Sequence, residues 1–393
     1  KDTRYQNTAE FLGSAIRIAE YYGFQSLDEA PRRDSAELRE MRRRARRNES
    51  EILVARKEER PLVVAAKKVS LCARLPNESL LLWRIHTETK TGIPHASLEL
   101  HLVGTSSAIA EALLIVIVNA IAHEAGIEKR VLLINTIGSN ESSGRYVRDV
   151  GSYLRKHLDS ISPTLRPRVA DDPLGTLVQL IERGHPAVPR APQATEYLTE
   201  EERRRFWDLL EYLEVFGIPY ELSPHVLGSR DCWSHALFEF LAIDGESGSR
   251  MPLAFGGRYD PLAARFAASP SAATTVSITC EIRGRARPKR AIPGIPSIYF
   301  AHLGGEARRR SLSVLENLRS AGIPVHHGLY QERIGEQMLT ARRLATPYIL
   351  IMGHKEAVEG TILVREVATN SQDAIPLPEL PGYLKRRRLF SVA

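Results

Sequence analysis

The sequence predicts an α+β domain built on an antiparallel sheet, followed by a smaller α/β domain. A chain of 393 residues is too long for one ordinary hydrophobic core. An apolar strand at 236–243 precedes two adjacent glycines, which we expect to open the next strand of an antiparallel sheet. From residue 297 apolar runs alternate with helical patterns, which favours an α/β layer with a mainly parallel sheet. We therefore expect domains at 1–288 and 289–393, joined by a Gly, Pro and Arg-rich linker at 283–296.

Apolar spacing places the elements of the first domain. A helix over 11–24 ends at Gly23, a natural C-cap, and the charged stretch 29–60 reads as a basic helix flanked by loops. The other expected elements are helices at 106–125, 144–158 and 200–216 and strands at 80–84, 98–103 and 130–136. We expect a polar loop between the first two strands, and irregular structure in the Pro and Gly-rich stretch 163–192.

The second domain has the clearest alternation. Strands are expected at 297–302, 323–326, 348–352 and 361–365, and helices at 306–321 and 334–345. Gly322 follows the first of these helices and is expected to cap it.

Composition excludes several classes of protein. Charged residues make up 26% of the chain and hydrophobic residues 43%, as in ordinary soluble proteins. The longest apolar run, 108–122, is too short to span a membrane and carries Glu111, so we expect no membrane partner. Three distant cysteines form neither a disulfide framework nor a zinc pattern, which favours a reducing cytoplasm. The histidines lack ligand spacing, so we expect no metal site.

Two basic runs stand out within a net charge of +7. One contains Arg42, Arg43 and Arg44, and the other contains Lys385, Arg386 and Arg387. Each run is either a solvated surface or a set of RNA phosphate contacts, and only the second function makes binding depend on salt.

The stretch Phe-Gly-Gly-Arg-Tyr-Asp at 255–260 carries the most informative motif. Gly256 and Gly257 allow close approach of another group, while Arg258 and Tyr259 offer a cation and an aromatic face. A glycine hairpin that carries polar side chains explains the motif as well as a ligand pocket does.

The surrounding residues resemble a known family. The order LFEFLAI, then FGGRYDPLAARF, resembles the histidyl-tRNA synthetase family, a class II aminoacyl-tRNA synthetase group. AIRIAEYYGFQSL resembles the first class-defining motif, and 333–372 resembles the anticodon-binding domain of the same enzymes. The resemblance implies the class II synthetase fold, a homodimer and a tRNA partner, and it leaves ATP with Mg²⁺ open as a cofactor.

By this resemblance two arginines are candidates for ATP phosphates. Arg84 follows Trp83 on an expected strand, and Arg283 ends a late strand. Arginine suits the task because its planar guanidinium pairs with phosphate oxygens bidentately. A surface role remains the alternative for each.

The residues expected to bind the amino acid depart from the family pattern. The family's catalytic arginine position holds Gly228, although Asp231 is kept and Arg230 follows two residues later. If this segment is a strand, Arg230 points to the same face as Gly228, displaced by about 6.6 Å. Cys232 and Trp233 replace two tyrosines of the histidine pocket.

The acidic segment of the family is also changed. Its Glu and Thr hold the histidine ammonium, but the matching stretch 61–71 has no carboxylate and carries Lys67 and Lys68. An ammonium left unpaired in a partly buried pocket would cost several kcal/mol. The sequence thus predicts a pocket that retains Asp231, Gly256, Gly257, Arg258 and Tyr259 without its negative wall.

Three functions stay open. The first is a family member without histidine activation that binds tRNA or another RNA, or regulates an enzyme. The second is an active, divergent histidine–tRNA ligase in which Arg230 replaces the missing arginine. The third is a regulatory subunit like that of ATP phosphoribosyltransferase, against which the anticodon-like domain argues.

Overall fold

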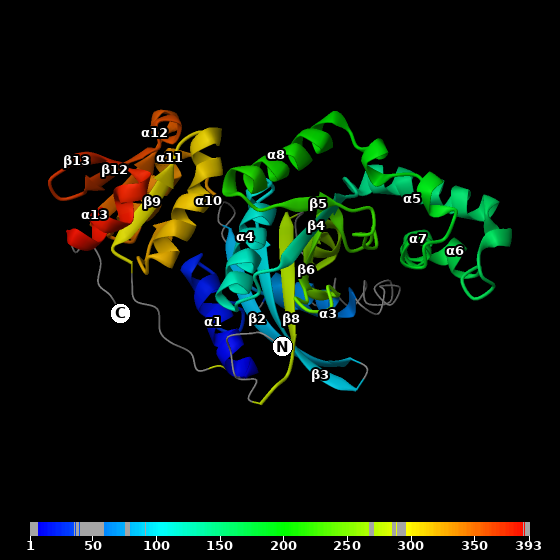
Figure 1. Cartoon of the computed structure of the whole chain (residues 1–393). Helices are drawn as coiled ribbons and strands as arrows, with labels where there is room; N and C mark the ends of the chain where they lie inside the picture. Colours follow the sequence, from blue (N-terminus) through cyan, green and yellow to red (C-terminus); the bar gives the residue numbers. More distant parts are fainter. Residues whose placement is uncertain are drawn as a thin grey trace.

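Two sheets organise the computed structural model (Figure 1). It describes residues 7–34, 36, 39, 59–74, 79–90, 92–266, 271–284, 288, 296–387 and 389. The first sheet has eight strands in the order β1-β2-β3-β8-β7-β6-β4-β5, and the second has five in the order β10-β9-β11-β12-β13. The predicted fold class, a large α+β domain followed by a smaller α/β domain, is confirmed.

The eight-stranded sheet is antiparallel except at its two edges. Its strands are β1 (Gln25–Ser26), β2 (Leu80–Lys90), β3 (Ile93–Val103), β4 (Arg130–Thr136), β5 (Tyr220–Leu222), β6 (Ser234–Ile243), β7 (Arg250–Arg258) and β8 (Ala273–Glu281). Only β1 with β2 and β4 with β5 pair in parallel. The polar loop expected between β2 and β3 is wrong, because the polar residues from Ile85 to Ser97 continue both strands of one long hairpin.

The turn between β6 and β7 also differs from expectation. It lies at 244–249, where the Asp244 carboxylate accepts hydrogen bonds from the backbone of Glu246 and Ser247. Gly256 and Gly257 therefore end β7 instead of opening it. A Cβ on Gly256 would lie 2.4 Å from the carbonyl oxygen of Thr275, so the close packing of β7 on β8 requires this glycine.

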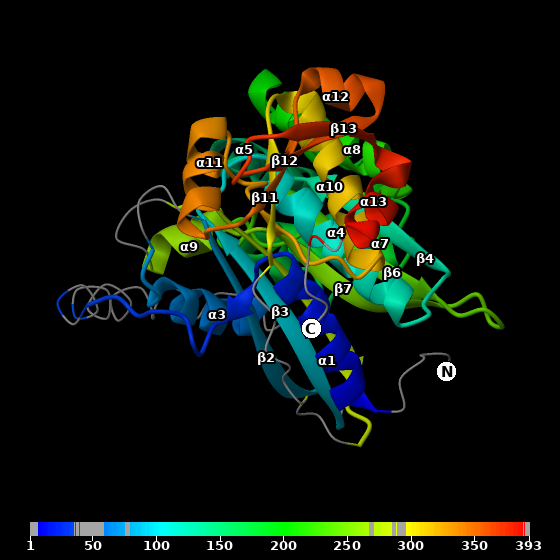
Figure 2. The same ribbon diagram turned by 90° about the vertical axis from the view of Figure 1, so that its left-hand side faces the viewer.

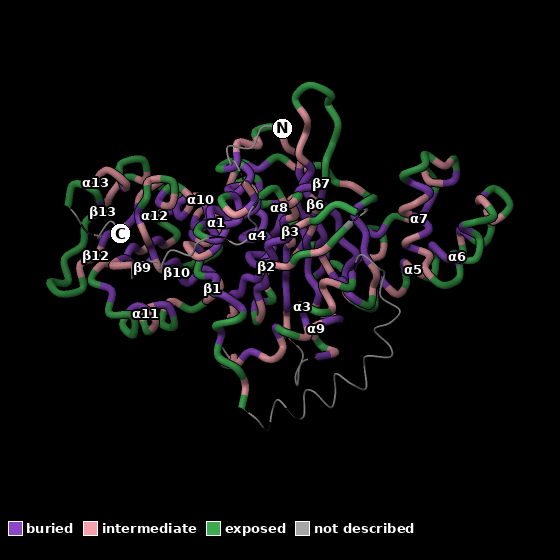
Figure 3. The backbone as a smooth tube through the Cα atoms, turned by 90° about the horizontal axis from the view of Figure 1, so that it is seen from below, coloured by how far each residue is buried: buried purple, intermediate pink, exposed green. Residues whose placement is uncertain are grey.

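One face of this sheet packs on three helices. They are α1 (Thr8–Tyr21), α4 (Ile109–Glu124) and α8 (Glu200–Phe216), and Figure 2 shows α1 lying alongside β3. The helix α4 is buried along nearly its whole length, which explains why its sequence is almost entirely apolar. Within the described part of the chain, no helix combines the length and apolarity needed to cross a bilayer. Figure 3 shows the buried helix α4 at the centre of the molecule and the exposed tip 245–250 of the β6–β7 hairpin.

The opposite face meets α3 (Arg60–Ser70), α9 (Asp260–Phe266) and a helical insertion. The insertion contains α5 (Asn140–Lys156), α6 (Arg168–Asp171) and α7 (Pro173–Glu182), and its apolar cluster extends to residues of β4, β6, α3 and α9. The expectation of irregular structure at 163–192 is therefore wrong. Pro173 occupies the first turn of α7, where a missing N–H costs nothing, and the Asp172 side chain caps the helix at Gly175.

The second sheet is mixed. Its strands are β9 (Ile298–His302), β10 (His326–His327), β11 (Tyr348–Met352), β12 (Thr361–Glu366) and β13 (Gln372–Pro376), and its helices are α10 (Gly305–Ser320), α11 (Ile334–Arg343), α12 (His354–Glu359) and α13 (Leu380–Arg386). The strands β10, β9 and β11 are parallel, but β12 and β13 are antiparallel. The expected mainly parallel sheet is thus wrong for β12, because the short connection through α12 cannot make a parallel crossover.

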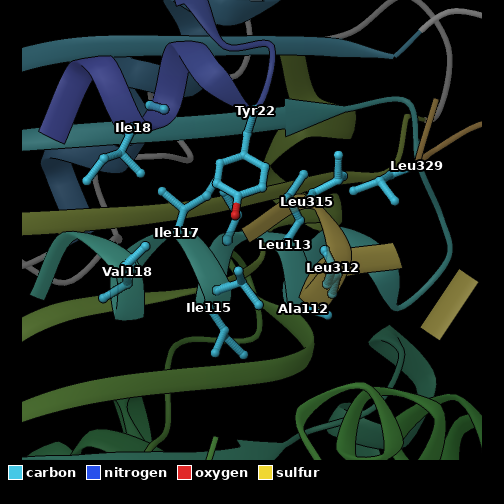
Figure 4. Packing of buried hydrophobic residues seen from close by; sticks show 14 of the residues in the cluster. Ile18, Tyr22, Ala112, Leu113, Ile115, Ile117, Val118, Leu312, Leu315 and Leu329 are labelled. Carbon is cyan, nitrogen blue, oxygen red and sulfur yellow. The ribbon is translucent and has the colours of Figure 1, made fainter. Parts of the chain in front are cut away.

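The helix α10 joins the two domains in one continuous core. In Figure 4, Leu312 and Leu315 lie beside Tyr22 of the first domain, and Leu113 of α4 is close to them. The Tyr22 hydroxyl donates to Glu316 at 2.6 Å. The predicted boundary at 288/289 falls between the two sheets, next to residues that the structure does not describe, and it stays a prediction.

Candidate functional site

Polar residues meet on the sheet face opposite α4. Arg84 of β2 lies directly across from Glu99 of β3, which lies across from Ser277 of β8. Directly paired residues of antiparallel strands point to the same side of a sheet, so these three side chains share one face. Arg84, one of the two arginines expected to contact ATP phosphates, therefore lies on this face.

Arg84 is already paired with a carboxylate. Both side chains are buried, and the guanidinium grips Glu99 through Nε to Oε2 and through Nη2 to Oε1 at 3.1 Å. Burial raises the pKa of the Glu99 carboxyl, but hydrogen bonds from His101 and Arg84 outweigh it and bring the pKa to about 2. The ion pair therefore persists at neutral pH, and it neutralises the charge that phosphate binding would use.

Arg258 of the glycine motif lies in the protein interior. Its side chain is 1% exposed and binds both oxygens of Glu111, at 3.0 and 2.9 Å, and the carbonyl of Thr105 at 3.1 Å. Complete burial raises the pKa of the Glu111 carboxyl, but the charges of Arg205 and Arg258 outweigh it and hold the pKa below its ordinary value. Arg258 thus fastens β7 to α4.

The neighbouring motif residues are equally enclosed. Tyr259 is buried, with its hydroxyl 3.3 Å from Nδ1 of His101. Gly256 and Gly257 are pressed against backbone carbonyls of the adjoining strands. A role of these residues in an amino-acid pocket stays a prediction, because each has a structural task in the fold.

The segment from Val226 to Trp233 is a loop, not a strand. It turns where the backbone N–H groups of Cys232 and Trp233 both donate to Ser229. The inference that Arg230 faces the same side as Gly228 is therefore wrong, because that inference requires the two-residue repeat of a strand.

Arg230 and Asp231 both point to partners on other elements. The Arg230 guanidinium donates to Asn140 at the start of α5, at 3.1 Å. The Asp231 carboxylate accepts from Arg265 of α9 at 3.0 Å. These contacts bring neither Arg230 nor Asp231 to Arg84.

Trp233 fills the space beside Gly228. A Cβ on Gly228 would lie 2.2 Å from Cδ1 of the indole, so the missing side chain is what admits the ring. The indole is 5% exposed and stands edge-on to Phe255 of β7, with ring centroids 5.3 Å apart. An arginine at position 228, as in the family pattern, cannot coexist with the indole in this position.

Glu59 supplies the carboxylate that the sequence comparison did not find. It lies just before α3 and accepts from Trp233 Nε1 at 3.0 Å, and from the backbone N–H and hydroxyl of Ser229 at 2.8 and 2.7 Å. The expectation that this region has lost its negative wall is corrected. The carboxylate is present, but its acceptor positions are occupied by groups of the protein itself.

Arg283 lies far from Arg84. The backbone pairing continues to Ile282, so Arg283 is six residues beyond Ser277, or about 20 Å along the strand. Its side chain is 65% exposed and 3.6 Å from Glu281. The arginines at 84, 230 and 283 therefore do not converge on one pocket.

These residues do not fit ATP with Mg²⁺. A triphosphate needs several free cations around one cavity, whereas Arg84 is neutralised by Glu99 and Arg283 is remote. Among the residues that the structure describes, no group of three or more His, Cys, Asp or Glu side chains could hold a metal ion.

Of the two sets of candidate RNA contacts, the structure describes the one on the second domain. Lys385, Arg386 and Arg387 are exposed at the end of α13, with Arg387 over the ring of Tyr383 and 3.6 Å from Asp373. Arg42, Arg43 and Arg44 fall outside the described residues. Their role in RNA binding stays a prediction.

The sequence reasoning missed Glu59 and the carboxylate partners Glu99 and Glu111. A signal for Glu59 was present, since it stands beside the pair Arg60-Pro61, while the family has its Glu on the other side of an Arg-Pro pair. Nothing in the local sequence indicates Glu111, which lies 147 residues from Arg258.

Comparisons with known proteins show which proteins this chain is similar to. Residues 298–387 match the family of the HGTP anticodon binding domain. The chain is 27% identical over 289 residues to histidine–tRNA ligase 1 of Shouchella clausii, covering 72% of this chain and 68% of that protein. It is also 27% identical over 299 residues to histidine–tRNA ligase of Thermosynechococcus vestitus, covering 75% and 69%.

A solved structure shares the fold. The apo histidyl-tRNA synthetase of S. aureus aligns with a TM-score of 0.50 and 19% identity, covering 96% of this chain and 95% of that one. The sequence relatives, the C-terminal domain match and the shared fold lead to one conclusion. The chain is similar to histidyl-tRNA synthetases in its sequence and in its fold, and its C-terminal part matches the anticodon binding domain.

Proposed function

We propose that this chain is an RNA-binding member of its family, with tRNA as the first candidate ligand, and that it does not activate histidine. The observation that carries the proposal is the indole of Trp233, which fills the space beside Gly228 and donates to Glu59. Gly228 stands at the position where the family pattern places its catalytic arginine, and Glu59 lies on the other side of the Arg60-Pro61 pair from the position of the family carboxylate.

Opening this space has a large cost. Burying an indole removes roughly 150–250 Å² from water, so displacing Trp233 costs about 4–6 kcal/mol at ~25 cal/mol per Å². Affinity falls tenfold for each ~1.4 kcal/mol, so an amino acid that must displace the ring binds at least about a thousandfold more weakly. Histidine would also have to replace the three donors that Glu59 already has.

The region around Arg84, which is expected to contact the ATP phosphates, supports the same proposal. Arg84 is buried in its pair with Glu99, and a phosphate approaching it would also meet the charge of that carboxylate. Breaking a buried pair by withdrawing one partner costs about 3–5 kcal/mol. We therefore expect neither ATP binding nor adenylate formation at this face.

The charge distribution supports RNA binding. Residues 289–393 contain 15 Lys and Arg against 9 Asp and Glu, a net charge of +6 out of +7 for the whole chain. Composition alone suggested that the net charge is spread over the chain. The count shows that it is concentrated in the second domain. That domain also carries the match to the anticodon binding domain and the exposed Lys385, Arg386 and Arg387. By family relationship we also propose a homodimer located in the cytoplasm.

The test combines two assays on the full chain. Histidine-dependent pyrophosphate exchange should give no turnover above a sample without histidine. Filter binding of tRNA over a salt series should show affinity that falls linearly on a log–log plot. Robust exchange would refute the proposal that the chain does not activate histidine. Undetectable tRNA binding at low salt would refute the proposed RNA binding.

Glu59 favours a second candidate, an active divergent ligase. It provides a carboxylate within the pocket region, which an ammonium could use if Trp233 moved away. This candidate predicts histidine-dependent exchange in the wild-type chain and a loss of exchange in Glu59→Gln. The exchange assay thus separates the two candidates directly.

A further inference from the structure

A surface groove runs between α5 and the short 3₁₀ helix η4 (Ala194–Tyr197). One wall is a single face of α5, because its lining residues there are spaced three and four apart. The other wall is the end of η4 and the turn that leads into α8. We call it the α5–η4 groove, and its charged and aromatic lining consists of Arg145, Arg148, Asp149, Glu196 and Tyr197.

The α5–η4 groove is separate from the sites described above. It shares no lining residue with the glycine motif or with the site formed by Glu59, Gly228 and Trp233. Figures 1 and 3 place α5 at the opposite end of the molecule from α13, which carries the proposed RNA contacts. The structure describes every residue from 92 to 266, so both walls are complete.

Two guanidinium groups line the groove, and neither forms an ion pair with a described carboxylate. Arg145 donates to the hydroxyl of Ser142 at 3.3 Å and to the carbonyl of Tyr197 at 3.0 Å, which holds it across the groove. Arg148 lies one turn further along α5, and its side chain makes no hydrogen bond or ion pair with the described part of the chain. Because a guanidinium binds a carboxylate through two parallel hydrogen bonds, both arginines keep N–H groups for such a ligand.

Two carboxylates line the same groove, and neither pairs with a cation of the described residues. Asp149 accepts from the hydroxyl of Tyr197 through one oxygen, at 2.9 Å. Burial and this hydrogen bond raise the pKa of Tyr197 to about 12, so the hydroxyl keeps its proton at neutral pH. Within the described residues Glu196 accepts only from the backbone N–H of Gln193, at 3.5 Å. An ammonium group carries three donors and suits two such carboxylates.

The mixture of charges limits the chemistry of the ligand. Two arginines and two carboxylates give the lining no net charge. A phosphate or an RNA backbone would meet Asp149 and Glu196, and a polyamine would meet Arg145 and Arg148, so each would be repelled by part of the lining. A ligand with one carboxylate and one ammonium finds a partner for both.

The size of the groove fits a small ligand. Its volume is about 690 Å³, and sites for small molecules have roughly 300–1,000 Å³. It thus has room for a single amino acid and also for a peptide of a few residues.

We propose that the α5–η4 groove binds a small zwitterion, with its carboxylate at Arg145 and Arg148 and its ammonium at Asp149 and Glu196. The ligand is a free amino acid or a short peptide, which differ in the distance between the two charges. This site adds a small-molecule ligand to the proposed RNA binding and does not depend on it.

The test is a calorimetric titration of the full chain with alanine, dialanine, trialanine and tetraalanine. Alanine is chosen because it does not report on a histidine pocket. At least one member of the series should bind saturably, and its length distinguishes a free amino acid from a peptide. The same member without its ammonium (N-acetylated) or without its carboxylate (amidated) should bind about fivefold more weakly, as expected for the loss of one exposed ion pair.

Two variants assign each charge of the ligand to its partner. In Arg148→Gln the amidated form should bind as well as the parent, because the carboxylate has lost its partner, while acetylation still weakens binding. Glu196→Gln should show the reverse, and glutamine retains an acceptor for Gln193. Arg183→Gln removes an exposed charge of the same insertion outside the groove and should behave as wild type.

The comparison of parent and blocked ligands needs only the wild-type chain, so it does not depend on any variant folding. Failure of all four ligands to saturate at tens of millimolar would overturn the proposal. So would blocked ligands that bind wild type as well as their parents, or a wild-type pattern in both Arg148→Gln and Glu196→Gln.

Discussion

Replacing Gly228 by alanine tests the packing on which the proposed function depends. The new methyl carbon would lie 2.2 Å from Cδ1 and 2.8 Å from Nε1 of Trp233, well inside van der Waals contact. The indole must therefore move, and its hydrogen bond to Glu59 must lengthen or break. The other two donors to Glu59, both on Ser229, stay in place.

The expected loss of stability follows from three contributions. Overpacking a well-filled site costs about 1–3 kcal/mol, and losing a hydrogen bond to a carboxylate costs about 1.5–3 kcal/mol. Replacing glycine by alanine stiffens the unfolded chain and returns about 0.4–1 kcal/mol. We therefore expect Gly228→Ala to lower the free energy of unfolding by about 2–5 kcal/mol.

Urea unfolding followed by tryptophan fluorescence measures this effect. Trp233 is buried whereas Trp207 is 63% exposed, so movement of Trp233 should shift the emission of the folded protein to longer wavelength. Gly245→Ala is the matched control, because a Cβ there meets nothing within 4 Å. We expect the control to stay within about 0.5 kcal/mol of wild type.

A double-mutant cycle identifies the cause. In a Trp233→Ala background the new methyl group has no ring to meet, so Gly228→Ala should cost little there. Equal costs in both backgrounds would refute the steric explanation. Wild-type stability and unchanged emission in the single variant would remove the main support for a closed pocket.

Three further predictions concern charged groups. Glu111→Gln should lower the free energy of unfolding by about 3–5 kcal/mol in urea, because the buried Arg258 then loses its bidentate carboxylate partner and keeps only Asp260, at 3.5 Å. The pKa of Glu99 is about 2, below its unfolded value, so its contribution of about 3 kcal/mol is present above pH ~4.5 and is lost as the pH falls towards 2. Glu99→Gln should remove that part of the acid dependence of unfolding. Replacing Arg386 and Arg387 together by glutamine should weaken tRNA binding and flatten its log–log salt slope by about 0.7–0.9 per lost phosphate contact.

Each of these has a control. Glu200→Gln removes an exposed carboxylate from α8 and should change stability by less than about 0.5 kcal/mol. A pH profile of Glu99→Gln parallel to that of wild type would contradict the assigned pKa. An unchanged salt slope in the double arginine variant, or the same loss in Arg230→Gln, would show that α13 is not the contact.

Periodicity in the sequence was enough to predict most of the fold. The helices α1 and α8 each bury one face, which is visible as apolar spacing, and α4 is visible as a nearly continuous apolar run. The long β2–β3 hairpin was missed because its outer half is partly exposed and carries polar residues on both faces. The short helix α7 was missed because Pro173 reads as a breaker unless it is placed in the first turn.

The candidate site was much harder to predict. Its decisive contacts join residues far apart in the chain, such as Glu59 with Ser229, 170 residues away. The partner of Arg84 was also out of reach, because it depends on the register of β2 against β3, and a shift of one residue would put Glu99 on the other face. Sequence comparison could show which family residues are absent, but not which residues now occupy the space.

The glycine motif illustrates why a retained motif need not mean a retained activity. Gly256 is required by the carbonyl of Thr275, and a Cβ on Gly257 would lie 2.6 Å from the carbonyl of Ala236. Arg258 binds Glu111 across the core, and Asp260 accepts from the backbone of Ala273 at 2.7 Å. The fold alone therefore needs these residues, whether or not an amino acid ever binds. The proposed function therefore depends on Gly228 and Trp233, which stand where the family pattern has an arginine and a tyrosine, and not on the retained glycine motif.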